Sequence, residues 1–172
     1  FPLGIGFIAS YTLKVLKDEV ETSLHKLPEE LLEELTKFKP DFLCFSQYNW
    51  NAKLSYIIAS YAKKINPKII TIFGGPDFPV EKNARHNFLK ERPAIDFYIK
   101  SDGEYAFVRL VKKLIDFKLN VKKFKDAFIE LPNVCYVKDE NYIEGPHERV
   151  ENLMAVPSPY TTGLMDKFFK LR

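Results

Sequence analysis

Three short segments of the sequence combine polar, aromatic and glycine residues that could bind a ligand. Ser46–Asn51 places the only Trp beside Tyr, Gln and Asn, and such a segment can form a polar wall against a large flat ligand. Gly74–Pro76 begins with two glycines, which let a backbone turn sharply or approach a ligand closely. Ser101–Glu104 precedes a helical pattern, where exposed amides suit an anionic or polar group.

Each segment also has a purely structural interpretation. Asn51 is placed to cap the next helix, with the neighbouring rings packed at the edge of a sheet. Gly74–Pro76 lacks both the G-x-G-x-x-G spacing of dinucleotide sites and the G-K-[ST] of a phosphate loop. Ser101 and Glu104 have the spacing of a capping box. The candidate binding residues of the three segments are Ser46, Gln47, Tyr48, Trp50, Asn51, Gly74, Gly75, Pro76, Ser101, Asp102, Gly103 and Glu104.

The residue types that carry catalysis or bind metals are scattered. His25, His86 and His147 are isolated from one another, so no nucleophile–base arrangement is visible. Cys44 and Cys135 lie within apolar runs, which indicates small buried side chains rather than metal ligands. We therefore expect neither a catalytic residue nor a metal ligand in this chain.

Composition narrows the possible classes of protein. The 172 residues are 46% hydrophobic and 28% charged, with a formal net charge of +3, as in one globular domain. The densest basic stretch, Lys112–Lys125, is interpreted as a solvated helix end and loop, so no nucleic-acid partner is expected. No apolar run reaches the length of a membrane span, so no membrane partner is expected. Two buried thiols without a signal peptide favour a cytoplasmic protein.

Short β-rich runs alternate with amphipathic helical runs. Nearly continuous apolar runs such as Phe42–Phe45 and Ile69–Phe73 are typical of parallel strands covered on both faces. The pattern predicts an α/β fold, a Rossmann-like (flavodoxin-like) open, mainly parallel sheet with helices on both faces. The predicted strands are Val20–Leu24, Asp41–Ser46, Lys68–Phe73 and Asp96–Lys100. The predicted helices are Gly6–Leu16, Glu29–Phe38, Leu54–Ile65 and Glu104–Phe117.

The pattern changes after this α/β part, which we assign to residues 1–126. Val134–Lys138 and Tyr142–Gly145 flank a turn-like triplet and predict a small β-hairpin within residues 127–145. Residues 146–172 are expected to form a linker toward a further domain, because prolines and polar residues dominate their first part. Since the helical pattern starts almost at Phe1, we expect a fragment that lacks one strand before that residue.

Five segments, taken in order, resemble the N-terminal cobalamin-binding domain of radical S-adenosylmethionine (radical SAM) proteins. They are Pro2–Tyr11 (PLGIGFIASY), Phe45–Asn51 (FSQYNWN), Phe73–Pro76 (FGGP), Ser101–Glu104 (SDGE) and Pro157–Tyr160 (PSPY). The first adds Pro2, Leu3 and Gly4 to the candidate binding residues. The last resembles the connector that leads into the radical SAM domain. Together the matches span nearly the whole chain.

The resemblance implies that cobalamin lies across the strand ends of a 2-1-3-4-5 sheet. Its nucleotide tail would enter near Gly74 and Gly75. The C-x-x-x-C-x-x-C cluster motif is absent, so the iron–sulfur cluster, S-adenosylmethionine and the radical reaction, methyl transfer among others, would belong to another domain of the parent chain. The D-x-H-x-x-G motif is also absent, and His25 follows the wrong strand, so cobalamin is expected to bind without a histidine ligand from this chain.

Two other hypotheses remain open. The first is the same fold without cobalamin, acting as a docking or regulatory module. The second is a response-regulator-like or glycosyltransferase-like domain. A response regulator needs an acidic cluster, which Asp77 and Asp102 do not provide, and a sugar-nucleotide enzyme needs a metal or diphosphate site that the sequence does not show.

Overall fold

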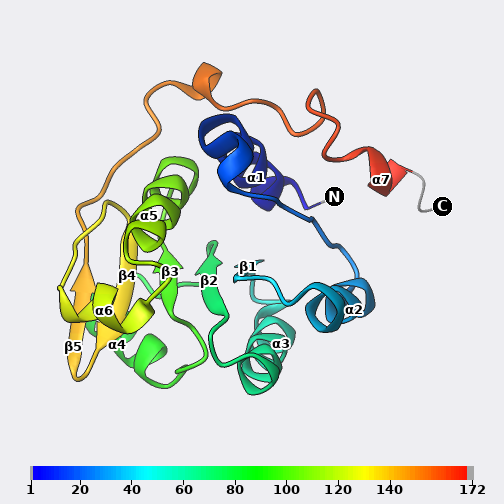
Figure 1. Ribbon diagram of the computed structural model, residues 1–172. Helices are drawn as coiled ribbons and strands as arrows, with labels where there is room; N and C mark the ends of the chain where they lie inside the picture. The colour runs from blue at the N-terminus through cyan, green and yellow to red at the C-terminus, as the bar shows by residue number, and fades with distance from the viewer. Residues whose placement is uncertain (1, 170–172) are drawn as a thin grey trace.

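A five-stranded sheet organises the computed structural model, which describes residues 2–169. The strands lie side by side in chain order, and the first three, which follow the nearly continuous apolar runs, are parallel (Figure 1). The last two form a hairpin that continues the same sheet in the antiparallel sense. The strands are β1 (Phe42–Ser46), β2 (Ile70–Gly74), β3 (Phe97–Ile99), β4 (Val134–Lys138) and β5 (Asn141–Glu144).

Helices cover both faces of this sheet because each central strand is apolar on both sides. Ile70 and Ile72 of β2 pack in the cluster that holds Leu110, whereas Phe73 packs with Ala59 on the opposite face. Figure 1 shows the two layers of helices above and below the strands. One face carries α1 (Leu3–Leu16), α5 (Glu104–Asp116) and α6 (Val121–Asp126), and the other carries α2 (Pro28–Phe38), α3 (Ala52–Ile65) and α4 (Lys82–Lys90).

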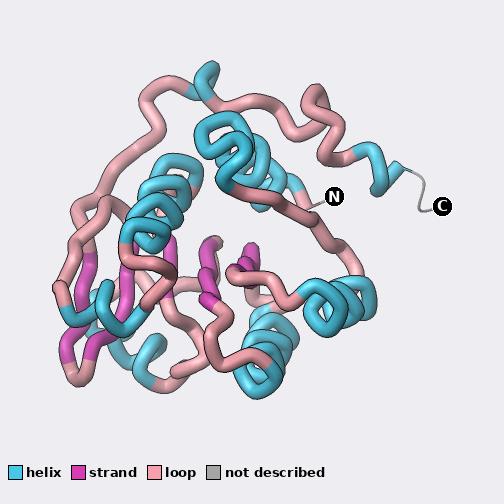
Figure 2. Tube along the Cα trace, in the orientation of Figure 1, coloured by secondary structure: helices cyan, strands magenta, loops and turns pink. Residues whose placement is uncertain are grey.

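The α/β architecture predicted from the sequence is confirmed, and three predicted strands form within two residues of their expected bounds. Val20–Leu24 is wrong as a strand. This stretch belongs to the loop between α1 and α2 (Figure 2), because no neighbouring strand supplies hydrogen bonds to it. The expected capping box is also wrong, since Gly103 is the N-cap of α5 and no side chain caps that helix.

The segment after the hairpin packs back on the α/β part. Asp102 Oδ2 accepts hydrogen bonds from Arg149 Nε and Val150 N, each at 2.9 Å. Ser10 Oγ donates to the carbonyl oxygen of Pro157 at 2.6 Å, so the chain crosses α1 before it reaches the short helix α7 (Asp166–Phe169). Two 3-10 turns, Lys17–Glu19 and Leu153–Ala155, complete the elements. Within residues 2–169, no helix is both long and apolar enough to cross a membrane.

Glu144 ties the hairpin to the rest of the sheet. Its Oε1 accepts a hydrogen bond from Arg85 Nη1 at 2.8 Å and another from Lys100 Nζ. Burial raises the pKa of Glu144, but the hydrogen bond from Lys100 and the charges of Lys100 and Arg85 outweigh it, so the pKa lies below its ordinary value.

We expect Glu144→Gln to lower the free energy of unfolding at pH 7 by about 1–2 kcal/mol, because charged hydrogen bonds are lost. A carboxyl whose pKa is lowered by folding stabilises the protein above its unfolded pKa and loses this contribution as the pH falls. The difference between Glu144→Gln and the parent should therefore shrink below about pH 4.5 in urea titrations. Glu140→Gln is the control, because its exposed pair with Lys90 should contribute under about 0.5 kcal/mol. A difference that stays constant to pH 3 would contradict the prediction.

Candidate functional site

The carboxyl ends of the three parallel strands meet at one edge of the sheet, which is where open α/β sheets bind ligands. A cavity of about 240 Å³ lies there. Its walls come from the ends of β1, β2 and β3 and from the first turns of α1 and α5. Nine sequence-predicted residues line it: Gly4, Ser46, Tyr48, Gly74, Gly75, Ser101, Asp102, Gly103 and Glu104.

Glycines bring backbone close together at this edge. Gly75 has a φ of +127°, and a Cβ there would lie 2.3 Å from the backbone oxygen of Gln47. A Cβ on Gly103 would lie 3.0 Å from Ile8 Cδ1. Glycine at residue 75 therefore lets the turn after β2 pack directly against the loop after β1, and glycine at residue 103 lets the start of α5 approach α1.

The loop after β1 is fixed by Asn51. Its Oδ1 accepts a hydrogen bond from Tyr48 N at 2.8 Å, and its Nδ2 donates to the carbonyl oxygen of Ser46 at 2.9 Å. Asn51 stands at the N-cap of α3 as expected, but its side chain holds the preceding loop and does not cap the helix. This loop stacks Tyr48 on Trp50 with ring centroids 4.4 Å apart, and Trp50 remains 78% exposed. An exposed aromatic pair beside the strand ends can pack against a large flat ligand.

Two predicted site residues do not face the cavities. Gln47 is buried, and its Nε2 donates to Asp77 Oδ2 at 2.9 Å while its backbone N–H donates to Gly74 O at 2.6 Å. Gln47 therefore joins the loop after β1 to the loop after β2. Pro76 continues the turn after Gly75 and lines neither cavity.

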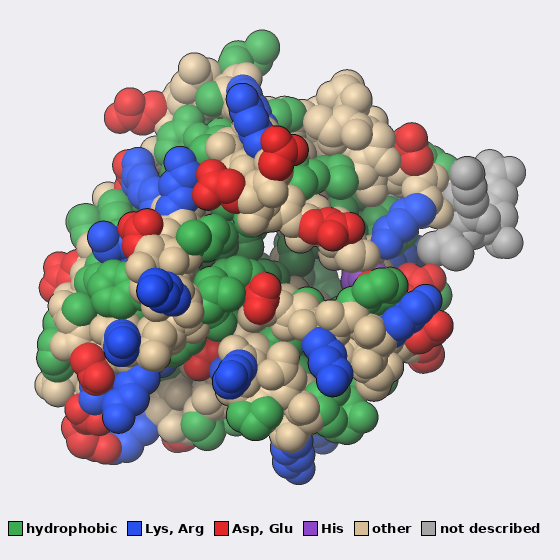
Figure 3. Space-filling view, viewed as in Figure 1, with side chains coloured by type: hydrophobic (Ala, Val, Ile, Leu, Met, Phe, Trp, Pro, Cys, Tyr) green, Lys and Arg blue, Asp and Glu red, His purple; other side chains and the backbone are tan. Residues whose placement is uncertain are grey.

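A larger cavity of about 620 Å³ adjoins the first and opens on the face shown in Figure 3. Pro2, Leu3, Trp50 and Asn51 line it, and Gly4, Ser46 and Tyr48 line both cavities. Most of its wall comes from α1, the loop before α2, α2 and the outer edge of β1. Sequence analysis missed most of this space because the part of its wall between residues 20 and 44 carries no motif.

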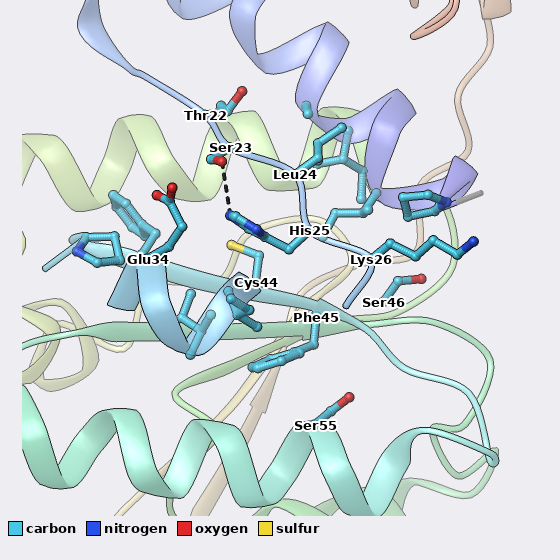
Figure 4. Close-up of a pocket in the computed structure, with 18 of the residues that line it drawn as sticks. Thr22, Ser23, Leu24, His25, Lys26, Glu34, Cys44, Phe45, Ser46 and Ser55 are labelled. Atoms are coloured by element: carbon cyan, nitrogen blue, oxygen red, sulfur yellow. Dashed lines mark hydrogen bonds between the residues drawn. The ribbon is translucent and has the colours of Figure 1, made fainter. Parts of the chain in front are cut away.

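His25 and Cys44 face each other across part of the larger cavity (Figure 4). Burial lowers the pKa of His25, and the charge of Lys167 lowers it further, so the ring favours its neutral form. Its Nε2 lies 3.0 Å from Ser23 Oγ. Burial raises the pKa of the Cys44 thiol to about 12, so this thiol stays protonated at neutral pH. Within residues 2–169, no group of three or more His, Cys, Asp or Glu side chains could hold a metal ion.

The fold defines a doubly wound α/β domain with a cavity at the carboxyl ends of its parallel strands. A family model described as the B12 binding domain matches residues 4–111. This range includes Gly74, Gly75 and Gly103 and the loop after β1. The chain therefore belongs to the B12-binding domain family, and its ligand is cobalamin. The expectations of fold, family and cofactor drawn from the sequence are confirmed.

Longer proteins share this domain. The cobalamin-dependent radical SAM methyltransferase TokK of Streptomyces tokunonensis is 29% identical over 130 residues, which are 74% of this chain and 18% of TokK. The uncharacterised methyltransferase PH0819 of Pyrococcus horikoshii is 27% identical over 97% of this chain and 35% of its own length. The cobalamin-dependent S-adenosylmethionine radical enzyme OxsB, solved with aqua-cobalamin bound, has the same fold, with a TM-score of 0.62 and 20% identity over 98% of this chain and 24% of OxsB. The chain thus spans about a third or less of each of these proteins.

Proposed function

We propose that cobalamin binds across the carboxyl edge of β1, β2 and β3, over the smaller cavity. The position of Gly74, Gly75 and Gly103 carries this proposal, because they line the cavity without side chains and a ligand can approach their backbone closely. Tyr48 and Trp50 supply an aromatic wall beside the strand ends. Gly103 and Glu104 at the start of α5 line the same space, and the N-terminus of a helix suits a polar or anionic group of a ligand.

No histidine lines the smaller cavity, and His25 faces the middle of β1 from the larger one. We therefore propose that this chain holds cobalamin without a histidine ligand to cobalt. His25→Ala is expected to leave cobalamin retention unchanged.

The parent protein is proposed to be a radical SAM enzyme, and a methyltransferase reaction is favoured because TokK and PH0819 are both described as methyltransferases. Bound cobalamin would supply a transferable methyl group. The residues of this chain would bind and orient the cofactor, while a second domain of the parent chain would hold the iron–sulfur cluster and S-adenosylmethionine. The relatives support this division, because TokK is a cobalamin-dependent radical SAM methyltransferase and this chain matches only 18% of its length.

An alternative function is docking to another domain without retention of cobalamin. The outer side of α3 favours it, because Leu54, Ile57, Tyr61 and Ile65 are each more than 40% exposed and recur at helical spacing. A partly exposed apolar stripe of this kind is typical of an interaction surface.

Desalting after incubation with hydroxocobalamin tests the proposed function. We expect the protein to retain the visible absorbance of the corrin. Ser46→Phe should abolish retention, because a ring at residue 46 would enter both cavities, whereas Ser46→Ala should preserve it. Circular dichroism should show both variants folded. Loss of corrin absorbance from the unaltered protein would favour the docking module, and equal retention by Ser46→Phe would place the ligand elsewhere.

A further inference from the structure

The chain after β5 returns along two helices whose first turns line the smaller cavity. We call residues 146–157 the return segment. Figure 1 shows it leaving β5 beside α5 and crossing above α1. Tyr105 Oη of α5 donates a hydrogen bond to Asn152 O at 3.3 Å, and Lys14 Nζ of α1 donates to Ala155 O at 2.7 Å. The return segment therefore contacts two of the elements that form the walls of this cavity.

A buried asparagine joins the return segment to the loop between β3 and α5. Asn133 is 2% exposed and directly precedes β4. Its Oδ1 accepts a hydrogen bond from Glu148 N at 2.9 Å, and its Nδ2 donates to Glu148 O at 2.7 Å and to Asp102 O at 3.1 Å. A carboxamide carries a donor and an acceptor side by side, as a peptide group does. Asn133 therefore pairs with both backbone groups of Glu148, as a residue of a neighbouring strand would.

The backbone of Asn133 is fixed as well. Its N–H donates to Pro146 O at 2.9 Å, and its carbonyl oxygen accepts from Lys100 N at 2.9 Å. Its φ is +61°, in the left-handed region that Asn tolerates better than most residues with a Cβ. Because Lys100 directly follows β3, Asn133 is held between the end of that strand and the return segment.

Asp102 makes the same connection from the side of the cavity. It lines the smaller cavity, and its Oδ2 accepts hydrogen bonds from Arg149 Nε and Val150 N, as described above. Within residues 2–169, all hydrogen bonds of Asp102 are made with Asn133 or with these two residues. The neighbouring Ser101 has a φ of +59°, a conformation that persists only where the surroundings impose it. The loop of residues 101–104 therefore takes its position from Asn133 and the return segment as well as from the sheet.

We propose that Asn133 is a positioning residue of the cobalamin site, which holds the loop of residues 101–104 through Asp102 and couples cobalamin binding to attachment of the return segment. Asn133 and the return segment both lie outside residues 4–111, the range that matches the B12 binding domain. The proposal rests on the proposed function, because it requires cobalamin to contact this loop. Coupling between two sites is reciprocal, so the factor that attachment adds to cobalamin affinity is also the factor that cobalamin adds to attachment.

Asn133→Gly tests the role of the side chain, because glycine keeps the left-handed backbone. We expect the affinity for hydroxocobalamin, measured by titration of the corrin absorbance, to fall about 10-fold, within the usual range of coupling between two sites. Asn120→Gly is the matched control. It removes the side chain that accepts a hydrogen bond from Lys123 N at 2.9 Å, and Asn120 lines neither cavity. Its affinity should equal that of the unaltered protein, and circular dichroism should show both variants folded.

Amide hydrogen exchange measures the reciprocal effect. Val150 is the probe, because its N–H donates to Asp102 and not to Asn133. We expect saturating hydroxocobalamin to slow exchange of the Val150 amide about 10-fold in the unaltered protein and less than about 2-fold in Asn133→Gly. The Met154 amide donates within the return segment, to Asn152 Oδ1 at 3.0 Å, so cobalamin should leave its exchange unchanged. A purely structural role of Asn133 would lower the free energy of unfolding without changing the effect of cobalamin on Val150.

Arg149→Glu supplies a second variant that leaves the core intact. Arg149 is 73% exposed and lines neither cavity. Glutamate at this position would repel Asp102 and release the loop, so we expect the affinity for hydroxocobalamin to fall about 3-fold at low ionic strength and to recover in about 0.5 M salt. Lys112→Glu makes the same change of charge at an exposed position of α5 and should leave the affinity unchanged.

Three outcomes would overturn this proposal while leaving cobalamin binding intact. They are equal affinity in Asn133→Gly and the unaltered protein, no slowing of Val150 exchange by saturating hydroxocobalamin in the unaltered protein, and equal affinity in Arg149→Glu and Lys112→Glu. The last two do not require Asn133→Gly to fold. Absence of corrin retention by the unaltered protein would overturn the proposed function and this proposal with it, so the two failures are distinguishable.

Discussion

Gly75→Ala is expected to lower the free energy of unfolding by about 3 kcal/mol and to abolish cobalamin retention. The new Cβ would lie 2.3 Å from the Gln47 backbone oxygen and 3.0 Å from its nitrogen. Backbone atoms cannot rotate away as a side chain can, and a φ of +127° is a conformation that residues with a Cβ rarely adopt. The turn after β2 would therefore separate from the loop after β1. Urea unfolding and the desalting assay measure the two effects.

Gly4→Ala is the matched control, because Gly4 also borders the strand ends. Its Cβ would meet only Ser46 Oγ at 3.7 Å, an ordinary contact, and Gly4 lies in a helix, where Ala is favoured over Gly by up to about 1 kcal/mol. We expect the free energy of unfolding to be equal to or slightly higher than that of the parent protein. A Gly75→Ala protein with the urea midpoint of the parent would show that the contact between the two loops is not needed.

Asp96→Ala is expected to destabilise the protein by about 3–5 kcal/mol. Asp96 Oδ2 accepts hydrogen bonds from Thr71 N at 2.8 Å, from Thr71 Oγ1 at 3.0 Å and from Lys63 Nζ. The side chains of Asp96 and Lys63 are only 12% and 22% exposed. Removal of the carboxylate leaves a cation mostly buried without its counter-charge, at the point where β2, β3 and α3 meet.

Two comparisons test this explanation of the Asp96 effect. Asp116→Ala removes the carboxylate of an exposed pair with Lys113, at 3.8 Å, and should cost under about 0.5 kcal/mol. The double variant Lys63→Met with Asp96→Ala should recover part of the lost stability, because it removes the buried cation. If the double variant is no more stable than Asp96→Ala alone, loss of the Thr71 hydrogen bonds and not the unpaired charge explains the effect.

Much of the sheet could be predicted because its central strands are buried on both faces and therefore have continuous apolar runs. Val20–Leu24 shows the limit of that reasoning. Its residues suit a strand, but a strand also needs a neighbour, and backbone pairing depends on residues distant in the sequence. The capping box failed for a related reason: the spacing of Ser101 and Glu104 is correct, but Ser101 has a φ of +59° and the helix begins after Gly103.

The candidate site was predictable in position but not in the role of each side chain. Glycine and polar residues after apolar strands mark the edge of the sheet, and the structure brings them together there. Gln47 belongs to the same segment as Tyr48 and Trp50, yet its side chain turns inward to Asp77. The directions of side chains along a loop follow no fixed period, as they do along a strand or a helix. The sequence therefore could not show which of these residues face a ligand and which join the two loops.

The amino-acid sequence by itself determined the α/β architecture, the positions of its three parallel strands and the segments that line the cavity at their ends. These properties depend on local patterns of apolar residues, glycines and short motifs. Only the tertiary structure decided that Asn51 and Gln47 hold loops, that Asp96 neutralises Lys63, and that the larger cavity lies beside β1. Each of these depends on the distance between groups far apart in the chain, and that distance is set by how the helices and strands pack.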